Sequence, residues 1–417
     1  MRPRHLTPLL CAAAVLFTIP LFCAFAPTQI TLDFGPGQAI LGEAQLQGGW
    51  YNYEAKLALT KGRNLFARAL QMGENDTFAG TFPDIIQYID RLAPQYEVAA
   101  YDGQVNFHPD QTPLFTVTNQ RAGKIIDRER LYGDILAVLK GNKFPTVKVH
   151  YQTVAPTPAE QIIAGITKRS HFSTHFNDNP PREKNLRLAL SKFHGLVVHP
   201  GETVSFNQIV GARTAAQGYE AAKIIVGGEY VDGIGGGVCQ VSTTIFNAVA
   251  QAGLHILEAH NHSLPSSYVP LGKDAMVSSG VDLRFANNTG APVYFATKVQ
   301  NNHLHVTIYG RDKGQNITYQ LATQTIKDTP PKDAWEKDLP EKTIKDYQKH
   351  PKKYDRVLLS AGRDGHTVDT YLETYQGDKR LSRKLLRRAT YQPTPNKYTL
   401  RLKDAPPPTD PDSAPSQ

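Results

Sequence analysis

The stretch from residue 235 to residue 253 constrains the fold of this chain most strongly. Three consecutive glycines precede Val-Cys-Gln, and apolar residues then recur at every fourth position up to Gly253. These residues are Val241, Ile245 and Val249. Such spacing is typical of one face of a helix, and a glycine is a common helix stop. The stretch therefore predicts a glycine-rich turn that leads into a helix, with Cys239 at the helix start.

Cys239 is the only cysteine outside the N-terminal apolar segment, because Cys11 and Cys23 both lie within that segment. The remainder of the chain can therefore form no intramolecular disulfide. In an oxidising compartment, an unpaired thiol is a liability unless it is buried, paired between chains or used in chemistry.

A helix start suits a reactive thiol. Unpaired N–H groups and the positive end of the helix dipole stabilise a thiolate and lower the pKa of the thiol. The backbone N–H groups of Gly236, Gly237, Val238 and Cys239 are candidate donors to a developing oxyanion. The alternative is a tight turn around an inert, buried cysteine.

Two histidines, His260 and His262, follow about twenty residues later. In a strand they would project from the same face. One histidine could act as a base toward Cys239 while the other, or Asp274 or Asp282, orients it for acyl transfer. We favour His262 as the base and His260 as its orienting partner, with Asp274 as the next choice.

The same residues suggest a second possibility. Cys239, His260 and His262 are ligands that zinc accepts, with a fourth position left open for water. The sequence contains neither another cysteine nearby nor an HExxH motif. We therefore predict neither a metal nor any other cofactor, and keep a zinc-dependent wall hydrolase as an alternative.

The N-terminus indicates export. Arg2 and Arg4 precede an uncharged, almost continuously apolar stretch at 6–26, which is typical of a signal peptide or membrane anchor. Pro27 directly follows a small-x-small cleavage site and would hinder cleavage, which favours an anchor. We predict an extracytoplasmic protein in the cell wall or anchored in the membrane and facing outward.

Composition agrees with such surroundings. Lys and Arg number 46 against 38 Asp and Glu, a net charge of +8 that favours anionic partners such as lipid headgroups or wall polymers. No nucleic-acid-binding motif accompanies the charge, so no nucleic-acid partner is predicted.

The pattern of elements predicts a multidomain α+β protein, because strand-like and helical runs alternate along most of its 417 residues. Strands are expected at 30–34, 115–118, 146–151, 356–360, 367–375 and 387–402, and helices at 57–70 and 83–93. The expected divisions are a signal or anchor at 1–26, an α+β domain at 27–155, a central α+β domain at 161–310, a linker and β-rich region at 311–403, and a disordered tail at 404–417.

The central region resembles the VanW domain found in wall-associated bacterial proteins. The resemblance rests on motifs at 172–177, 199–207, 210–214, 218–219, 235–240, 260–265, 268–275 and 282–285. Ala259 departs from it, since the family often has arginine there. The preceding sequence is similar to a peptidoglycan-binding-like domain, and 356–402 is similar to G5-type β modules.

The resemblance implies that peptidoglycan stem peptides are the partner and that Cys239 is the nucleophile of an L,D-transpeptidase. Cys239 would form a thioester with a stem peptide, release D-Ala, and pass the acyl group to a second stem as a 3-3 cross-link. A non-catalytic peptidoglycan-binding module is the main alternative.

Overall fold

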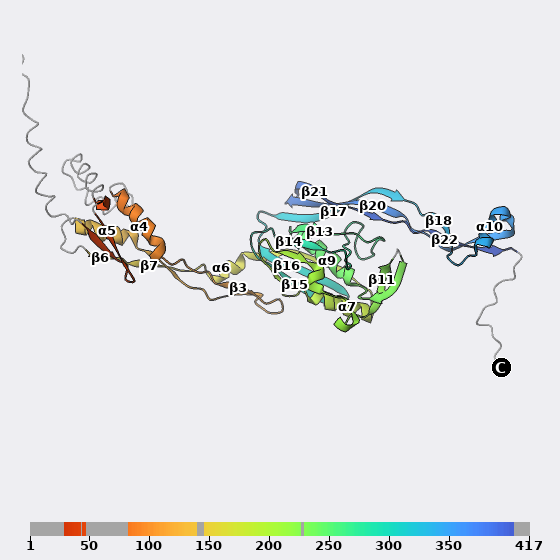
Figure 1. The fold of residues 1–417 in the computed structure, drawn as a ribbon, viewed down its shortest axis with the longest axis horizontal. Coiled ribbons are helices and arrows are strands. Elements are labelled where there is room, and N and C mark those ends of the chain that lie inside the picture. Colours follow the sequence, from red (N-terminus) through yellow and green to blue (C-terminus); the bar gives the residue numbers. More distant parts are fainter. Residues whose placement is uncertain (1–28, 43, 47–81, 140–145, 227–228, 404–417) are drawn as a thin grey trace, which may run out of the picture. The chain divides into compact units, whose positions relative to one another are not determined.

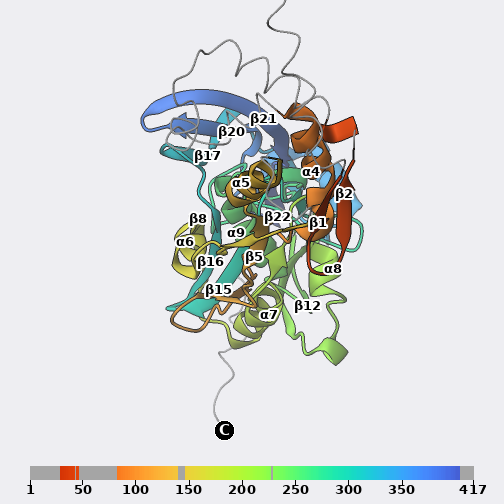
Figure 2. The ribbon, with the colours of Figure 1, turned by 90° about the vertical axis from the view of Figure 1, so that its left-hand side faces the viewer.

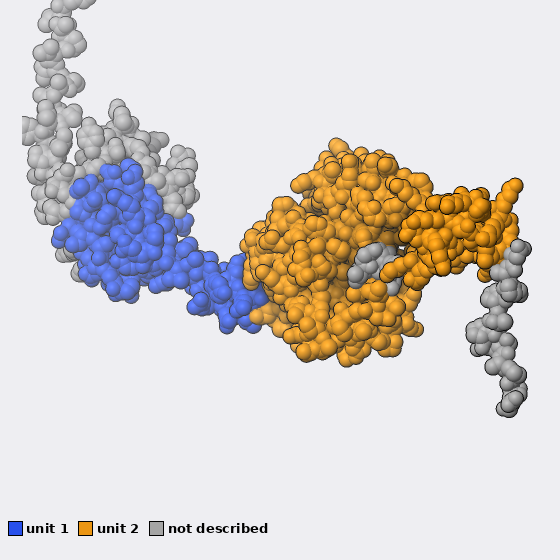
Figure 3. Space-filling view, turned by 45° about the vertical axis from the view of Figure 1, so that its right-hand side comes forward, with its two compact units in different colours: residues 1–105, 117–159 blue, residues 106–116, 160–417 orange. Residues whose placement is uncertain are grey.

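The computed structural model describes residues 29–42, 44–46, 82–139, 146–226 and 229–403. The expected anchor at 1–26, the helix at 57–70 and the tail at 404–417 lie outside these residues. The chain divides into two compact units, residues 1–105 with 117–159 and residues 106–116 with 160–417 (Figure 3). Helices alternate with several separate sheets, which confirms the predicted α+β class (Figure 1). Within the described ranges, no helix has the length and apolar character needed to cross a bilayer.

Unit 1 is built on a small sheet and two helices. The sheet has the order β2-β1-β6, with β1 antiparallel to β2 and parallel to β6. The strands of this sheet and the two helices are β1 (Ile30–Asp33), β2 (Gln38–Leu41), α4 (Pro83–Tyr96), α5 (Arg128–Leu139) and β6 (Thr146–Lys148). The strands β5 (Gly123–Ile126) and β7 (Tyr151–Val154) form a separate antiparallel pair. Ile30, Ile85 and Ile135 are fully buried, so the inward faces of β1 and both helices share one core.

The tip of one hairpin from the N-terminal part of the chain belongs to unit 2. Strands β3 (Gln104–Phe107) and β4 (Phe115–Thr118) pair with each other, and residues 106–116 group with unit 2. Phe107 and Phe115 stack with ring centroids 5.1 Å apart, and Phe115 meets Tyr294 edge-on at 5.0 Å. The sequence analysis assigned these residues to the domain at 27–155. The contact between Phe115 and Tyr294 joins residues far apart in the sequence, so no local pattern could predict it.

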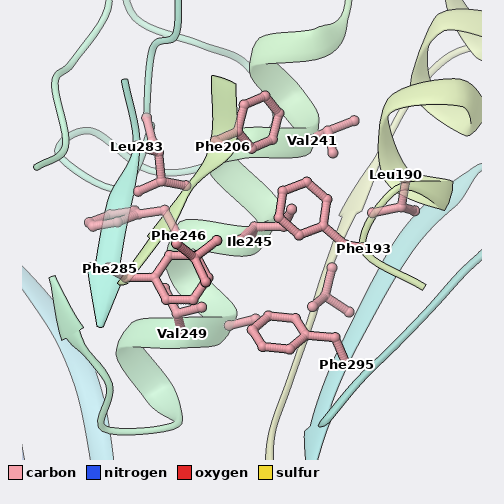
Figure 4. Packing of buried hydrophobic residues seen from close by; sticks show 14 of the residues in the cluster. Leu190, Phe193, Phe206, Val241, Ile245, Phe246, Val249, Leu283, Phe285 and Phe295 are labelled. Carbon is pink, nitrogen blue, oxygen red and sulfur yellow. The ribbon is translucent and has the colours of Figure 1, made fainter. Parts of the chain in front are cut away.

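A four-stranded sheet and a central helix form the core of unit 2. The sheet has the order β8-β16-β15-β9 and is antiparallel throughout. Its strands are β8 (Ile166–His175), β9 (Val197–Val198), β15 (Val293–Gln300) and β16 (His303–Arg311), and the helices beside it are α7 (Pro180–Ser191) and α9 (Val238–Gln251). Ile245 and Val249 of α9 pack among Phe193, Phe285 and Phe295 (Figure 4). Twelve of the fourteen residues of α9 are buried, so this helix lies inside the unit rather than on its surface.

Shorter elements surround α9. A second sheet has the order β10-β14-β13, and β11 pairs with β12 as a hairpin. These elements are β10 (Thr203–Ser205), α8 (Phe206–Val210), β11 (Ala221–Val226), β12 (Glu229–Ile234), β13 (His255–Glu258) and β14 (Arg284–Ala286). The short helix α6 (Ala159–Ala164) precedes β8 in the chain. Val204 of β10 and Phe285 of β14 are buried, so this sheet adds its inner face to the core around α9.

The C-terminal part of unit 2 forms two further three-stranded sheets. Figure 2 shows β17 (Ile317–Thr329), β20 (Gly365–Gln376) and β21 (Lys379–Tyr391) as one of them. The other has the order β18-β22-β19 and lies next to α10 in the chain. Its elements are β18 (Asp333–Trp335), α10 (Glu341–Lys349), β19 (Tyr354–Ser360) and β22 (Asn396–Leu402). The structure thus has β17 and α10 where the sequence suggested a linker, and Leu321 of β17 is buried in the core around α9.

Candidate active site

Each of the three glycines in the turn before α9 occupies a position that disfavours a larger residue. Gly235 and Gly237 have φ of 82° and 108°, in the region that favours glycine. Gly236 has ordinary φ, but a Cβ there would lie 2.5 Å from the carbonyl oxygen of Ala222. Left-handed backbone and close packing against β11 together bring Cys239 to the second residue of the helix.

Substitution of Gly236 by alanine is expected to destabilise the protein by about 2 kcal/mol, because the added methyl group meets backbone that cannot rotate away. Chemical denaturation of both proteins measures this loss. The matched control is Gly280→Ala, where the added Cβ would have no atom within 4 Å. Equal midpoints for the two variants would contradict the close packing of Gly236.

Cys239 is half-buried, and in its protonated form the thiol donates to the carbonyl oxygen of Val277 at 3.4 Å. Two of the expected oxyanion donors are engaged within the turn itself. The Gly236 N–H donates to Gly233 at 3.3 Å, and the Val238 N–H donates to Gly235 at 3.2 Å. The candidate oxyanion donors in this turn are therefore the N–H groups of Gly237 and Cys239.

His262 links the thiol to a buried carboxylate. Its Nδ1 lies 2.7 Å from Oδ2 of Asp274, and its backbone N–H donates to the same oxygen, also at 2.7 Å. The imidazole also lies close enough to the side chain of Cys239 for each group to shift the pKa of the other. Because Nδ1 is held by Asp274, Nε2 is the ring nitrogen left to interact with the thiol. The structure thus brings Cys239, His262 and Asp274 into one chain of contacts.

These contacts shift the pKa values of the thiol and the imidazole in opposite directions. Burial alone would raise the pKa of Cys239, but the hydrogen bond and positive charge of His262 lower it below its ordinary value. Burial alone would lower the pKa of His262, but hydrogen bonds to Asp274 and Cys239 raise it to about 9. These shifts favour a thiolate paired with an imidazolium over a neutral thiol beside a neutral imidazole.

Asp274 is 1% exposed and accepts hydrogen bonds on both oxygens. Oδ2 accepts from His262, while Oδ1 accepts from the Tyr391 hydroxyl at 2.5 Å and lies 3.6 Å from Nη2 of Arg387. Burial would raise the pKa of Asp274, but the bonds from His262 and Tyr391 lower it. The carboxylate is therefore ionised, as an orienting partner of a charged histidine must be.

His260 lies apart from this chain of contacts. Strand β13 ends at Glu258, so the two histidines do not share a strand face. His260 is exposed, with Nε2 3.2 Å from Oε1 of Glu258, whereas His262 is 6% exposed. The expectation that His260 orients His262 is corrected, because Asp274 occupies that position. Asp282 is also excluded, since its carboxylate accepts from Ser205 and from the backbone of Asn207.

The three suggested zinc ligands do not converge. Nδ1 of His262 is bonded to Asp274, and His260 is bonded to Glu258. In the part of the chain that the structure describes, no group of three His, Cys, Asp or Glu side chains is arranged to hold a metal ion. Cys239, His260 and His262 therefore do not form the ligand set that the zinc alternative requires.

Sequence reasoning missed several polar neighbours of the thiol. Burial together with the charge of Cys239 raises the pKa of the Tyr268 phenol. Arg213 lowers the pKa of Cys239 by its charge, and its Nη1 lies 3.4 Å from the carbonyl oxygen of Val277. Both residues lie within the motifs that resemble the VanW domain, at 210–214 and 268–275, so the sequence did contain a signal. No local pattern indicated that either residue lies beside Cys239.

The pH dependence of alkylation tests the thiolate–imidazolium pair. Iodoacetamide should modify Cys239 with an inflection below the roughly 8.5 of a free thiol. His262→Ala removes the positive charge, so burial should then raise the pKa of Cys239 and reduce the rate at pH 7 at least about tenfold. His260→Ala is the matched control and should leave the profile unchanged. An unchanged profile in His262→Ala would contradict the pairing.

Known proteins are similar to the part of the chain that carries this site. The family model described as VanW like protein matches residues 181–309. Uncharacterized protein YoaR of Bacillus subtilis (strain 168) is 37% identical over 196 residues, which are 46% of this chain and 65% of that protein. Vancomycin B-type resistance protein VanW of Enterococcus faecalis (strain ATCC 700802 / V583) is 28% identical over 149 residues, 34% of this chain and 54% of that protein.

The chain therefore spans less than two thirds of the length of either curated relative. No solved structure matches it. Residues 181–309 form a VanW-like domain, which confirms the resemblance found in the sequence. This matched region contains Cys239, His262 and Asp274 but ends before Arg387 and Tyr391.

Proposed function

We propose that this chain is an extracytoplasmic, wall-associated acyltransferase that uses Cys239 as its nucleophile. Its reaction is L,D-transpeptidation of peptidoglycan stem peptides, which forms 3-3 cross-links. The observation that carries the proposal is the chain of contacts from Cys239 through His262 to the ionised Asp274. A thiolate beside an imidazolium that a carboxylate orients is the arrangement that nucleophilic acyl transfer requires. The wall association rests on the VanW likeness and on the apolar N-terminal segment.

In the first half of the reaction, the Cys239 thiolate attacks the carbonyl carbon that joins the third residue of the donor stem to D-Ala. The carbonyl oxygen becomes an oxyanion, for which the N–H groups of Gly237 and Cys239 are the candidate donors. The imidazolium of His262 gives its proton to the departing nitrogen, and the C–N bond breaks. This step leaves a thioester on Cys239, a neutral His262 and free D-Ala.

In the second half, an amine of another stem attacks the thioester carbonyl and gives its proton to neutral His262. The C–S bond breaks, and Cys239 leaves as a thiolate beside the restored imidazolium. The product is an amide between two third-position residues. Asp274 remains ionised throughout, because its role is to hold His262 in the required orientation.

Intact-mass spectrometry on a tetrapeptide donor tests the proposal. Wild type should gain the mass of the donor minus D-Ala, and hydroxylamine should remove that adduct as expected for a thioester. Cys239→Ala should gain none. If wild type binds purified sacculi but forms no adduct and releases no D-Ala, the protein is a wall-binding module instead.

A further inference from the structure

We propose that Tyr391 and Arg387 of β21 are positioning residues of this site, so that the C-terminal sheet completes the active site of the VanW-like domain. The inference rests on the proposed acyl transfer for its catalytic meaning. Both residues lie beyond residue 309, where the family match ends. Together they contact the side chain of Asp274 and the backbone of the segment that carries it.

Tyr391 ties the carboxylate to its own loop. Its hydroxyl donates to Oδ1 of Asp274 at 2.5 Å and accepts from the Gly272 N–H at 2.7 Å. The side chain is 2% exposed, so water cannot easily replace either bond. A hydroxyl fixed by both bonds sets the rotation of the carboxylate and points Oδ2 at Nδ1 of His262.

Arg387 holds the same segment from the same strand. Its Nη2 donates to the carbonyl oxygens of Gly272, at 3.0 Å, and of Asp274, and lies 3.6 Å from Oδ1 of Asp274. Thr370 of β20 adds a bond from its hydroxyl to the Gly272 carbonyl at 2.8 Å. The positive charge of Arg387 compensates the buried carboxylate, and its hydrogen bonds fix the backbone.

The opposite side of the segment is held by the helix that carries the nucleophile. Ser242 donates to the Ala275 carbonyl at 2.5 Å, and Thr243 accepts from the Ala275 N–H at 2.8 Å. Asn247 donates to the Lys273 carbonyl at 2.8 Å. Asp274 therefore lies between α9 and the C-terminal sheet. Among the described residues, the hydroxyl that donates to Oδ1 of Asp274 comes from Tyr391 of that sheet.

The direct test is Tyr391→Phe, which removes one hydroxyl and keeps the ring. Without that bond, the carboxylate of Asp274 is held less firmly toward Nδ1 of His262, so the imidazolium is less stabilised. The inflection of Cys239 alkylation should then move to higher pH, and the alkylation rate at pH 7 should fall about tenfold, one unit of pKa. In stem-peptide exchange, kcat should fall while KM stays within about twofold.

The matched control is Tyr375→Phe on strand β20. Its hydroxyl is 2.7 Å from a carboxylate oxygen of Glu373, away from the thiol, so its alkylation profile should equal that of wild type. Arg387→Lys is the second variant, because it keeps the charge but loses the planar fork of donors. It should shift the profile in the same direction, whereas Arg388→Lys, whose partner is Asp369, should not.

The outcomes separate this inference from the proposed function. Alkylation needs no stem peptide, so the thiol profile reports on Tyr391 even if wild type transfers no acyl group. Folded Tyr391→Phe and Arg387→Lys proteins with wild-type profiles would overturn the positioning role. A wild type that shows no D-Ala release while Tyr391→Phe still shifts the profile would overturn the transpeptidase assignment alone.

Discussion

Cys239→Ser is expected to lose thioester formation and to exchange D-Ala at least roughly 10⁴-fold more slowly than wild type. Serine retains the size of the side chain and can still donate to the Val277 carbonyl. Its hydroxyl does not ionise near neutral pH, so the anion that His262 stabilises in wild type does not form. Release of D-Ala from a tetrapeptide in the presence of an amine acceptor measures the effect.

Two controls accompany this experiment. The unfolding transition of Cys239→Ser should remain cooperative, because the substitution nearly preserves the volume of the side chain and its hydroxyl can donate to the Val277 carbonyl. Binding to purified sacculi should also be retained, which separates loss of chemistry from loss of the partner. Exchange by Cys239→Ser within tenfold of wild type would show that the thiol is not the nucleophile.

Asp274→Asn should lower kcat by roughly 10²-fold to 10⁴-fold. The amide carries no negative charge to sustain the imidazolium, so the pKa of His262 should fall and that of Cys239 should rise. The amide nitrogen can also face Nδ1 of His262 as a donor, which selects the tautomer with its proton on Nε2. Single-turnover acylation at several pH values measures both effects.

Asp282→Asn is the matched control for this substitution. Asp282 is a partly buried aspartate close in sequence, but its carboxylate accepts from Ser205 and Asn207 rather than from a histidine. Its loss should lower the unfolding midpoint and leave the pH profile of acylation unchanged. An Asp274→Asn protein that keeps more than a tenth of the wild-type kcat would contradict the orienting role of Asp274.

Cys239 could be identified from the sequence as a candidate nucleophile because its context is local. Glycines, a four-residue apolar spacing and Gly253 together define a turn and a helix without reference to the rest of the chain. Local patterns likewise indicated the α+β class and the VanW-like domain, both of which are confirmed. The burial of most of α9 could not be predicted, because its buried polar residues find partners only in the folded unit.

The supporting residues were harder to assign because they depend on tertiary contacts. The choice of His260 as orienting partner assumed that the strand continued past Glu258, but the chain leaves the strand there. One histidine then enters the interior while the other remains in solvent. Arg387 and Tyr391 carry no local signature of a site, since they belong to an ordinary strand and meet Asp274 only through the packing of the C-terminal sheet.

The bond between Tyr391 and Asp274 also imposes an order on biogenesis. A chain is made from its N-terminus, and the two residues are separated by 117 positions. While the ribosome is still adding those positions, Cys239 and His262 already exist, but the carboxylate beside them lacks its hydroxyl partner. Under the proposed function, the thiol is fully positioned only after β21 has been synthesised and Tyr391 has bonded to Asp274, so a chain that ends before this strand would lack the complete site.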